Sequence, residues 1–450
     1  MKLNLKDNLK DNLKNTSKYN NGDKLLIKSS LGTLEGIFIT SSNNFLTLKL
    51  DSGYNISLSL KNIKEIEKIS NKISKTKSNK EQKIHKKIEG LKNISILNCG
   101  GTLASKVDYS TGGVSAKFTS DELYNLFPEI KEIANINFRL VKQYMSENLR
   151  FSHYNEIAKE IKNECDKGVD GIIITHGTDT MHYSAAALSF ILENINIPVI
   201  LVGSQRSSDR GSSDATYNLL SSVIFIANSN FSGVAICMHN DTNDKECSIL
   251  PGTKTRKLHS SRRDAFRPIN SKPYALVNPD KKEIKILSKF PENFQKDLPL
   301  NLKLFNDKIK IGLIKMHPNF FAEELLFYKN YDGLVVEGFG LGQIPNVHMD
   351  DQTKESDKII KAVKKLSKDK ILVMTSQTIY GRVCMNVYSE GRINLDAGFI
   401  GNNLDITTET AFIKLAWLLS NYSKEEAKIL FMKNLRDEIS ERNEQDEFLN

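Results

Sequence analysis

Over its C-terminal four-fifths, the chain alternates short apolar runs with stretches that repeat apolar residues at helical spacing. The runs NISILNC (93–99), GIIIT (171–175) and PVILV (198–202) are too short for helices, and helical patterns lie between them at 153–167 and 181–192. Strands that alternate with helices build a parallel sheet with helices on both faces. This pattern predicts an α/β fold.

The same alternation continues to residue 419 and predicts a second α/β unit. Further strands are expected at 233–238, 310–315, 333–337 and 371–375, and further helices at 214–228, 356–366 and 410–419. A chain of 450 residues exceeds what one core usually holds. We therefore expect two parallel-sheet domains in this part of the chain.

The first fifth of the chain has a different texture. Between residues 24 and 60, the runs KLLIKS, TLEGIFIT, FLTLKL and NISLSL are separated by the turn-forming SLG, SSNN and DSG. Four or five short antiparallel strands in so short a segment indicate a small barrel of SH3-like type.

Composition sets the expected boundaries between segments. The LKDN repeats at the N-terminus are of low complexity and indicate disorder. The predicted segments are a disordered tail (1–20), the small barrel (21–69), a basic linker (70–90), an N-terminal α/β domain (91–285), an interdomain linker (286–309), a C-terminal α/β domain (310–435) and a charged tail (436–450).

The net charge of +9 is concentrated near the N-terminus. Residues 1–90 contain 18 lysines and 9 acidic residues, while the remainder balances 45 basic against 45 acidic residues. Such asymmetry is compatible with nucleic acid or another polyanion as a partner, and equally with a solvated lysine-rich segment.

Several classes of protein are disfavoured. The sequence has no apolar run long enough to span a membrane and no apolar N-terminal stretch of a secretory signal. Its five cysteines are scattered without a CxxC pair, which favours reduced thiols in the cytoplasm. No metal site is expected, because no HxH or HExxH spacing occurs, and no GxGxxG predicts a dinucleotide site.

Three of the expected strands run directly into polar loops that contain glycine: GGT (100–102), HGTDT (176–180) and GSQR (203–206). Ligands of open parallel sheets bind beyond the carboxyl ends of the strands. GGT alone is more often a tight turn than a functional loop. HGTDT indicates hydroxyl chemistry, because a loop after a strand rarely needs four polar side chains for structure, and His176 is expected to orient it. A threonine hydroxyl needs a base or a cation nearby to become nucleophilic.

GGT and HGTDT together resemble the two signature motifs of L-asparaginases. Ser146-Glu147-Asn148 resembles the substrate-binding loop of that family, and GSQR resembles its characteristic loop at a strand end. The resemblance implies a two-domain asparaginase-like α/β fold with parallel sheets, preceded in this chain by the small N-terminal β-barrel.

The resemblance continues downstream and covers roughly residues 92–420. Lys257, nine positions before Phe266, aligns with the catalytic lysine of the family, and EGFGLGQIP (337–345) resembles a loop of its C-terminal domain. Lys254, three residues before Lys257, is the competing lysine in the same loop.

Other segments resemble one branch of the superfamily, the archaeal D subunits of glutamyl-tRNA(Gln) amidotransferase. These are RKLHSSRRDAFR (256–267), TSQTIYGRVCMNVYSEGR (375–392) and the basic N-terminal region, which plain asparaginases usually lack. The residues on either side of the GGT motif, Cys99 and Leu103, differ from the usual family pattern. Neither change removes the hydroxyl of Thr102, so the resemblance still implies activity.

The resemblance assigns catalytic roles to five residues. Thr102 and Thr178 would flank the carboxamide carbon of the substrate, with Thr102 favoured as the nucleophile. Asp179 and Lys257 would complete a Thr–Lys–Asp proton relay around Thr178. Tyr109 lies in a glycine-containing segment that could close over the site, where its hydroxyl could polarise Thr102.

Four residues are expected to bind the substrate, with a contribution from Asp179. Ser146 and Asp179 would hold its α-carboxylate and α-amino groups, and Glu147 is a second partner for the ammonium. Gly101 and Gly177 complete the set from the two motif loops.

The expected function is release of ammonia from glutamine or asparagine, for conversion of Glu-tRNA(Gln) to Gln-tRNA(Gln) by a partner subunit of E type. No cofactor is expected in this chain, and ATP and Mg are expected in the partner. The resemblance also implies tRNA in the complex and a homodimer within a heterotetramer. The alternatives are a stand-alone cytosolic L-asparaginase and a non-catalytic scaffold that binds RNA or protein.

Overall fold

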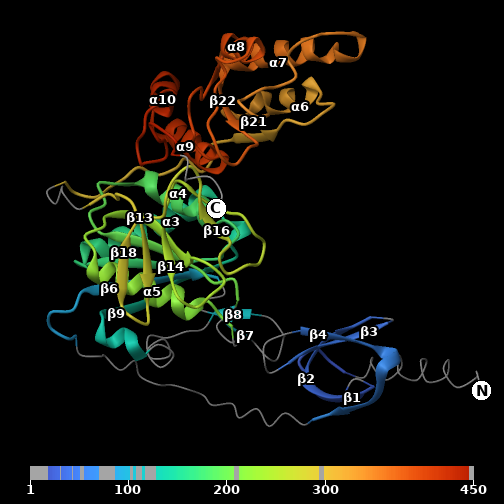
Figure 1. Cartoon of the computed structure of the whole chain (residues 1–450), viewed down its shortest axis with the longest axis vertical. Helices are drawn as coiled ribbons and strands as arrows, with labels where there is room; N and C mark the ends of the chain where they lie inside the picture. The colour runs from blue at the N-terminus through green and yellow to red at the C-terminus, as the bar shows by residue number, and fades with distance from the viewer. Residues whose placement is uncertain are drawn as a thin grey trace, which may run out of the picture.

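The computed structural model describes most of the chain, in ten stretches. They are residues 19–30, 32–42, 44–50, 55–69, 87–101, 105–107, 114–116, 128–206, 212–292 and 298–444. Of the predicted features, residues 1–18 of the N-terminal tail, 70–86 of the basic linker, 445–450 of the charged tail, Thr102 and Tyr109 lie outside these stretches. Figure 1 shows a small sheet in blue, a strand-rich body in green and yellow, and a C-terminal body in orange and red.

The N-terminal region forms a five-stranded antiparallel sheet in the order β4-β3-β2-β1-β5. The strands are β1 (Lys24–Ser29), β2 (Gly32–Ser41), β3 (Phe45–Lys49), β4 (Asn55–Ser59) and β5 (Ile63–Lys68). Leu25 and Ile27, two positions apart on one face of β1, are fully buried in a core shared with Leu46 and Leu48. The antiparallel strands are confirmed. No pairing among the described residues joins β4 to β5, so closure into a barrel stays a prediction.

The central sheet has eight strands in the order β18-β17-β14-β13-β12-β10-β6-β9. Its strands are β6 (Asn93–Gly100), β9 (Asn135–Tyr144), β10 (Gly171–Thr175), β12 (Pro198–Val202), β13 (Gly233–His239), β14 (Cys247–Pro251), β17 (Ala275–Asn278) and β18 (Glu283–Ile286). The five strands from β9 to β13 are parallel, which confirms the predicted arrangement, although no strand was expected at β9. The other three are antiparallel, which corrects the expectation of parallel strands alone. The loops from β13 to β14 and from β17 to β18 are too short for the crossover that parallel neighbours require.

Helices cover both faces of the central sheet, and strand β10 shows why. Its side chains are all buried, with Ile172 and Ile174 in one core and Ile173 in another. The first core includes α3 (Phe151–Asp166) and α4 (Met181–Ile191), and the second includes α5 (Ala215–Asn228). A strand buried on both faces reads as a continuous apolar run, which is what GIIIT shows.

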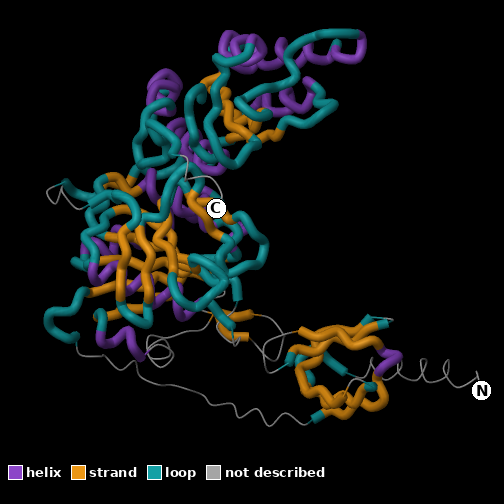
Figure 2. Tube along the Cα trace, in the orientation of Figure 1, coloured by secondary structure: helices purple, strands orange, loops and turns teal. Residues whose placement is uncertain are grey.

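The C-terminal domain is a smaller α/β unit with the parallel strand order β20-β21-β22-β23. The strands are β20 (Ile311–Lys315), β21 (Gly333–Gly338), β22 (Ile371–Ser376) and β23 (Phe399–Ile400). The helices are α6 (Ala322–Leu326), α7 (Glu355–Asp369), α8 (Ser389–Asp396), α9 (Thr408–Asn421) and α10 (Lys424–Phe431). Figure 2 shows helices more prominent here than in the strand-rich central body. In the described stretches, no helix is long and apolar enough to cross a membrane.

The two α/β domains share one apolar core. Helix α4 of the first domain packs against α9 of the second, and the rings of Phe190 and Trp417 lie 5.3 Å apart between their centroids. The connection between the domains adds a short strand, β19 (Asn301–Leu302), which pairs with β11 (Leu192–Glu193). The domains are therefore packed together rather than joined only by a linker.

Residues 436–444 are the described part of the predicted charged tail. They are irregular but held in place, and the side chains of Glu438 and Lys414 are fully buried as an ion pair with Nζ and Oε1 2.6 Å apart. Lys414 also donates to two backbone carbonyls, and Glu438 accepts from the backbone of Leu435 and Arg436. The pair fixes this end segment to α9.

Replacing Lys414 with methionine should destabilise the protein, because it leaves the buried Glu438 carboxylate without its cation. The expected loss is about 3–5 kcal/mol in the free energy of unfolding, measured by urea denaturation. The matched control is Lys162→Met, which breaks an exposed pair with Asp166 on α3 and should cost about 0.5 kcal/mol or less. Equal effects of the two substitutions would contradict this account.

Candidate active site

Three loops leave the central sheet at one edge, beyond the carboxyl ends of neighbouring parallel strands. Strand β10 lies between β6 and β12, and Thr175 at its end is opposite Asn98 on one side and Val202 on the other. The backbone NH of His176 continues this pairing by donating to the Val202 carbonyl over 2.9 Å. The GG, HGTDT and GSQR segments therefore converge, as the predicted sheet requires.

Lys257 reaches the same edge from a distant part of the chain. It ends β15 (Thr255–Lys257), which pairs with β16 (Phe266–Pro268). Its Nζ donates to Thr178 Oγ1 over 2.9 Å and to Asp179 Oδ1 over 2.8 Å. The lysine side chain is 9% exposed and the aspartate side chain 66%. The ammonium is thus shielded between a hydroxyl and a carboxylate that still faces solvent.

The glycines of the motif loops allow backbone contacts that a side chain would prevent. Gly101 has φ +85°, and a Cβ placed on it would lie 2.4 Å from the His176 carbonyl oxygen. A Cβ on Gly177 would lie 2.7 Å from Ser146 Oγ. Gly101, the residue before Thr102, therefore lies against the loop that carries Thr178.

The Ser146 loop lies beside HGTDT. Ser146 begins a short 3-10 turn, η3 (Ser146–Asn148), and is buried, whereas Glu147 is exposed. The hydroxyl of Thr180 donates to the Ser146 carbonyl over 2.7 Å. Of the residues predicted for the site, the structure thus brings together Thr178, Asp179, Lys257, Gly101, Gly177 and Ser146, with Glu147 next in the chain.

His176 is a buried hydrogen-bonded support for its own loop. Burial lowers its pKa to about 4, so the ring is neutral near pH 7. Nδ1 lies 2.6 Å from the Gly177 carbonyl and must donate to it, which leaves Nε2 to accept from the Ser184 hydroxyl at 2.9 Å. This geometry supports the interpretation of His176 as a residue that orients the loop.

The sequence did not single out His182, at the start of α4. Burial lowers its pKa to about 4, and the charges of Arg256 and Lys257 add to that effect. Its buried Nδ1 has no hydrogen-bond partner among the described residues. In the sequence, His182 is a single histidine in an apolar helical stretch, and no local pattern indicates that Lys257 lies near it.

Asp214 is a second residue that sequence reasoning missed. Its carboxylate accepts from the backbone NH groups of Gln205 and Arg206, over 3.0 to 3.1 Å, and from the Asn218 side chain over 3.0 Å. It therefore holds the GSQR loop at the sheet edge. The available signal was its position as the first residue of the predicted helix at 214–228, where aspartate is common.

The competing lysine, Lys254, is hydrogen-bonded to residues away from Thr178 and Asp179. It is 2% exposed, and its Nζ donates to Asp405 Oδ2 and Ser440 Oγ, each over 2.6 Å, and to the Asn270 carbonyl over 3.2 Å. The structure therefore favours Lys257 over Lys254 as the lysine of the site.

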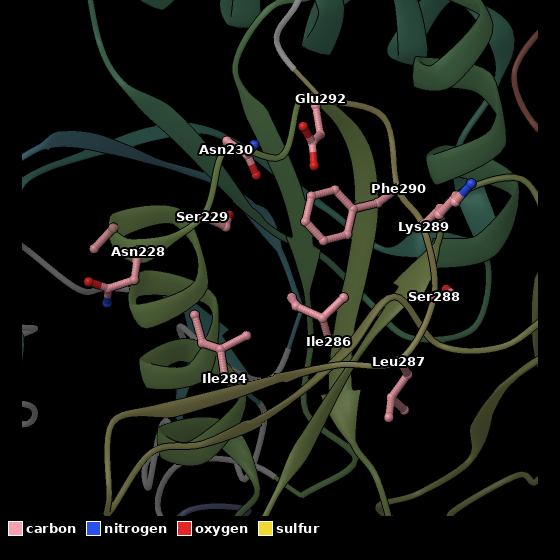
Figure 3. A pocket seen from close by; sticks show the side chains of 11 residues that line it. Asn228, Ser229, Asn230, Ile284, Ile286, Leu287, Ser288, Lys289, Phe290 and Glu292 are labelled. Atoms are coloured by element: carbon pink, nitrogen blue, oxygen red, sulfur yellow. The ribbon is translucent and has the colours of Figure 1, made fainter.

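A cavity of about 1230 Å³ lies away from these residues, between the end of α5 and β18. Figure 3 shows Ile284, Ile286 and Phe290 around it, with Asn228 and Asn230 beside them. Because α5 ends where the chain turns into β13, this cavity lies at the amino ends of the parallel strands, opposite the Thr178 edge. In the part of the chain that is described, no group of three or more His, Cys, Asp or Glu side chains could hold a metal ion.

Three family models match the chain in the order of its domains. The GatD N-terminal domain matches residues 19–69. The N-terminal asparaginase domain matches residues 93–291, and the glutaminase/asparaginase C-terminal domain matches residues 310–431. The asparaginase models alone cover well over half of the chain.

Curated relatives resemble the whole chain. The D subunit of glutamyl-tRNA(Gln) amidotransferase from Methanococcus maripaludis is 42% identical over 428 residues, which is 93% of this chain and 98% of the relative. The corresponding D subunit from Pyrococcus abyssi is 42% identical over 406 residues, 89% and 88% of the two chains.

Solved structures of asparaginases resemble the α/β body. The thermostable L-asparaginase of Thermococcus kodakarensis has a TM-score of 0.68 at 30% identity, covering 78% of this chain and 100% of its own. L-asparaginase I of Vibrio cholerae has a TM-score of 0.66 at 28% identity, covering 78% and 99%. With its three matched domains and these full-length relatives, the chain belongs to the family of glutamyl-tRNA(Gln) amidotransferase D subunits, within the L-asparaginase superfamily.

Proposed function

We propose that this chain is the amide-hydrolysing subunit of a Glu-tRNA(Gln) amidotransferase and releases ammonia from the side chain of glutamine or asparagine. The observation that carries the proposal is the contact of Lys257 with both Thr178 and Asp179. A scaffold that only bound RNA or protein would have no need of an ammonium enclosed between a hydroxyl and a carboxylate. Family membership supplies the tRNA-dependent reaction in which the ammonia is used.

The proposed chemistry proceeds in two stages. The Thr102 hydroxyl attacks the carboxamide carbon, and its proton passes to the leaving nitrogen. The carbon–nitrogen bond then breaks, ammonia departs, and the acyl group remains as an ester on Thr102. Water then attacks the ester and releases glutamate or aspartate. Lys257, held by Asp179, exchanges protons with Thr178 on the other side of the carbonyl, and Tyr109 polarises Thr102.

Substrate binding uses the residues around this relay. Ser146 and Asp179 hold the α-carboxylate and α-amino groups, and Glu147 adds a second contact for the ammonium. The exposure of Asp179 supports its role in substrate binding. Its carboxylate contacts Lys257 and still has a surface open to the substrate. Gly101 and Gly177 provide backbone where a side chain would collide with neighbouring chain.

The partner in this proposal is a second subunit of E type, which binds ATP and Mg and amidates Glu-tRNA(Gln). This chain itself needs no cofactor. The assembly is a heterotetramer built on a homodimer of this chain, located in the cytoplasm, where charged tRNA is made. The free state of Cys99, Cys165, Cys237, Cys247 and Cys384 is compatible with that compartment.

The N-terminal module separates this proposal from a stand-alone L-asparaginase. The asparaginase structures align with about 78% of the chain, and the family model at 19–69 covers a region before the asparaginase match. We propose the segment boundaries given above, with the 21–69 region acting in assembly or tRNA engagement. A solitary amidohydrolase would have no use for that module.

Replacing Thr178 with valine should lower the rate of ammonia release by about 10²- to 10⁴-fold, because it removes one hydroxyl at nearly constant volume. Thr102→Val should have an effect of the same order. Ammonia release and circular dichroism are measured together, with Thr178→Ser as the control that keeps the hydroxyl. A folded Thr178→Val protein with full activity would refute the paired-threonine site.

Lys257→Met should lower kcat by at least about 100-fold with much less change in KM, because the lysine acts in proton transfer. Lys245→Met, which removes an exposed lysine of the same domain, is the matched control and should leave both constants unchanged. Steady-state kinetics with glutamine and asparagine provide the measurement. An active Lys257→Met protein would transfer the catalytic role to another residue.

Amide hydrolysis should be coupled to the partner, because free hydrolysis would waste glutamine. A coupling free energy of about 1–3 kcal/mol predicts a stimulation of about 5- to 150-fold. The rate is measured for the isolated chain, with the partner subunit, and with the partner and Glu-tRNA(Gln). Full activity of the isolated chain, unchanged by either addition, would favour the stand-alone asparaginase.

A further inference from the structure

The strand that presents Lys257 has little support of its own. β15 has three residues and, within the described stretches, pairs only with β16, as a two-stranded sheet apart from the eight-stranded one. An isolated two-stranded ribbon is marginally stable. The position of Lys257 Nζ must therefore be fixed by contacts of β15 with other parts of the chain.

Those contacts are made by Lys254 and Arg256 rather than by Lys257 itself. Successive side chains of a strand point to opposite sides, so Arg256 and Lys257 diverge, and Lys254 directly precedes the strand. Lys254 Nζ lies 2.6 Å from Asp405 Oδ2, and Arg256 Nε lies 3.1 Å from Glu409 Oε1. Both acidic residues belong to the C-terminal domain, so that domain binds the residues on either side of Thr255, immediately before Lys257.

Asp405 is the centre of the larger anchor. It is 2% exposed, and besides Lys254 it accepts from the Ser440 backbone over 2.9 Å and from the Asn443 side chain over 3.2 Å. Ser440 Oγ also lies 2.6 Å from Lys254 Nζ. The charge of Lys254 is thus matched and hydrogen-bonded inside the protein, by the C-terminal domain and by the end segment 436–444.

The residue before Lys254 is bound in the same way. The Thr410 hydroxyl, on α9, donates to the Thr253 carbonyl over 2.7 Å, and the Thr253 hydroxyl donates to the Arg436 carbonyl over 2.9 Å. The chain entering β15 is consequently held at successive residues by the second domain and by the end segment.

We propose that Lys254 is a positioning residue for the amide-hydrolysis site, and that its anchor on Asp405 and Ser440 sets the reach of Lys257 to Thr178 and Asp179. The inference rests on the proposed role of Lys257 in proton transfer. It assigns the C-terminal domain and residues 436–444 a direct part in turnover. Displacement of a reacting group by about 1 Å can lower a rate about 100-fold, so release of this anchor should affect kcat more than substrate binding.

The test uses Lys254→Met, Ser440→Ala and Lys254→Arg in the full chain, with kcat, KM and the thermal midpoint measured for each. Lys254→Met should lower kcat about 10- to 100-fold and change KM much less. Ser440→Ala should have a smaller effect in the same direction, and Lys254→Arg, which keeps the charge, should retain more kcat than Lys254→Met. Val363→Ala, a cavity in the C-terminal core, is the stability control and should lower the thermal midpoint without lowering kcat.

A double-substitution cycle separates positioning from general damage. If Lys254 acts through Lys257, then Lys254→Met should have almost no further effect on kcat in a Lys257→Met background. Multiplicative losses, an unchanged kcat in Lys254→Met, or an equal loss of kcat in Val363→Ala would overturn the inference. Retained turnover in Lys257→Met alone would instead overturn the proposed function, so the two failures are distinguishable.

Discussion

The ammonium of Lys257 joins two segments that are 79 positions apart in the sequence, and the candidate site depends on that junction. One segment is the loop after β10, whose position is set by a strand buried on both faces. The other is β15, a short strand outside the main sheet. A shift of one residue in β15 would turn Lys257 to the opposite side of the strand. The site therefore combines a rigid half, built by the parallel sheet, with a half that depends on anchoring from elsewhere.

The sequence predicts the rigid half well because its signals are local. The run GIIIT reads as a buried strand, and the loop HGTDT follows it directly. The antiparallel strands β14, β17 and β18 were not anticipated, because the segments between residues 247 and 286 are short and lack a clear period. The choice between Lys254 and Lys257 also depends on contacts that local patterns do not contain. In the structure the two lysines differ because Lys254 contacts Asp405, which lies 151 residues away in the sequence.

The charge of the N-terminal region is another property whose location the sequence alone did not resolve. Within the five-stranded sheet, lysines at positions 24, 28 and 68 each form an ion pair, with Glu35, Glu65 and Asp23. Residues 19–69 contain 6 lysines and 5 acidic residues, whereas residues 1–18 and 70–86 together contain 11 lysines and 3 acidic residues. The excess that points to a polyanion therefore belongs to the sequences flanking the sheet. Attraction through those flanks would be sensitive to salt and independent of nucleotide sequence.

The anchoring of β15 also gives the C-terminal domain a physical role. None of the site residues predicted from the sequence lies in that domain, yet it is packed against the first domain through α4 and α9. Asp405, Glu409 and Thr410 all precede or begin α9, so one short region of the second domain contacts residues 253, 254 and 256. Buried ion pairs contribute little net stability relative to apolar packing, but removal of one partner is costly. A cluster of such contacts next to Lys257 is therefore better explained by a requirement for one fixed position of that lysine than by a requirement for adhesion between domains.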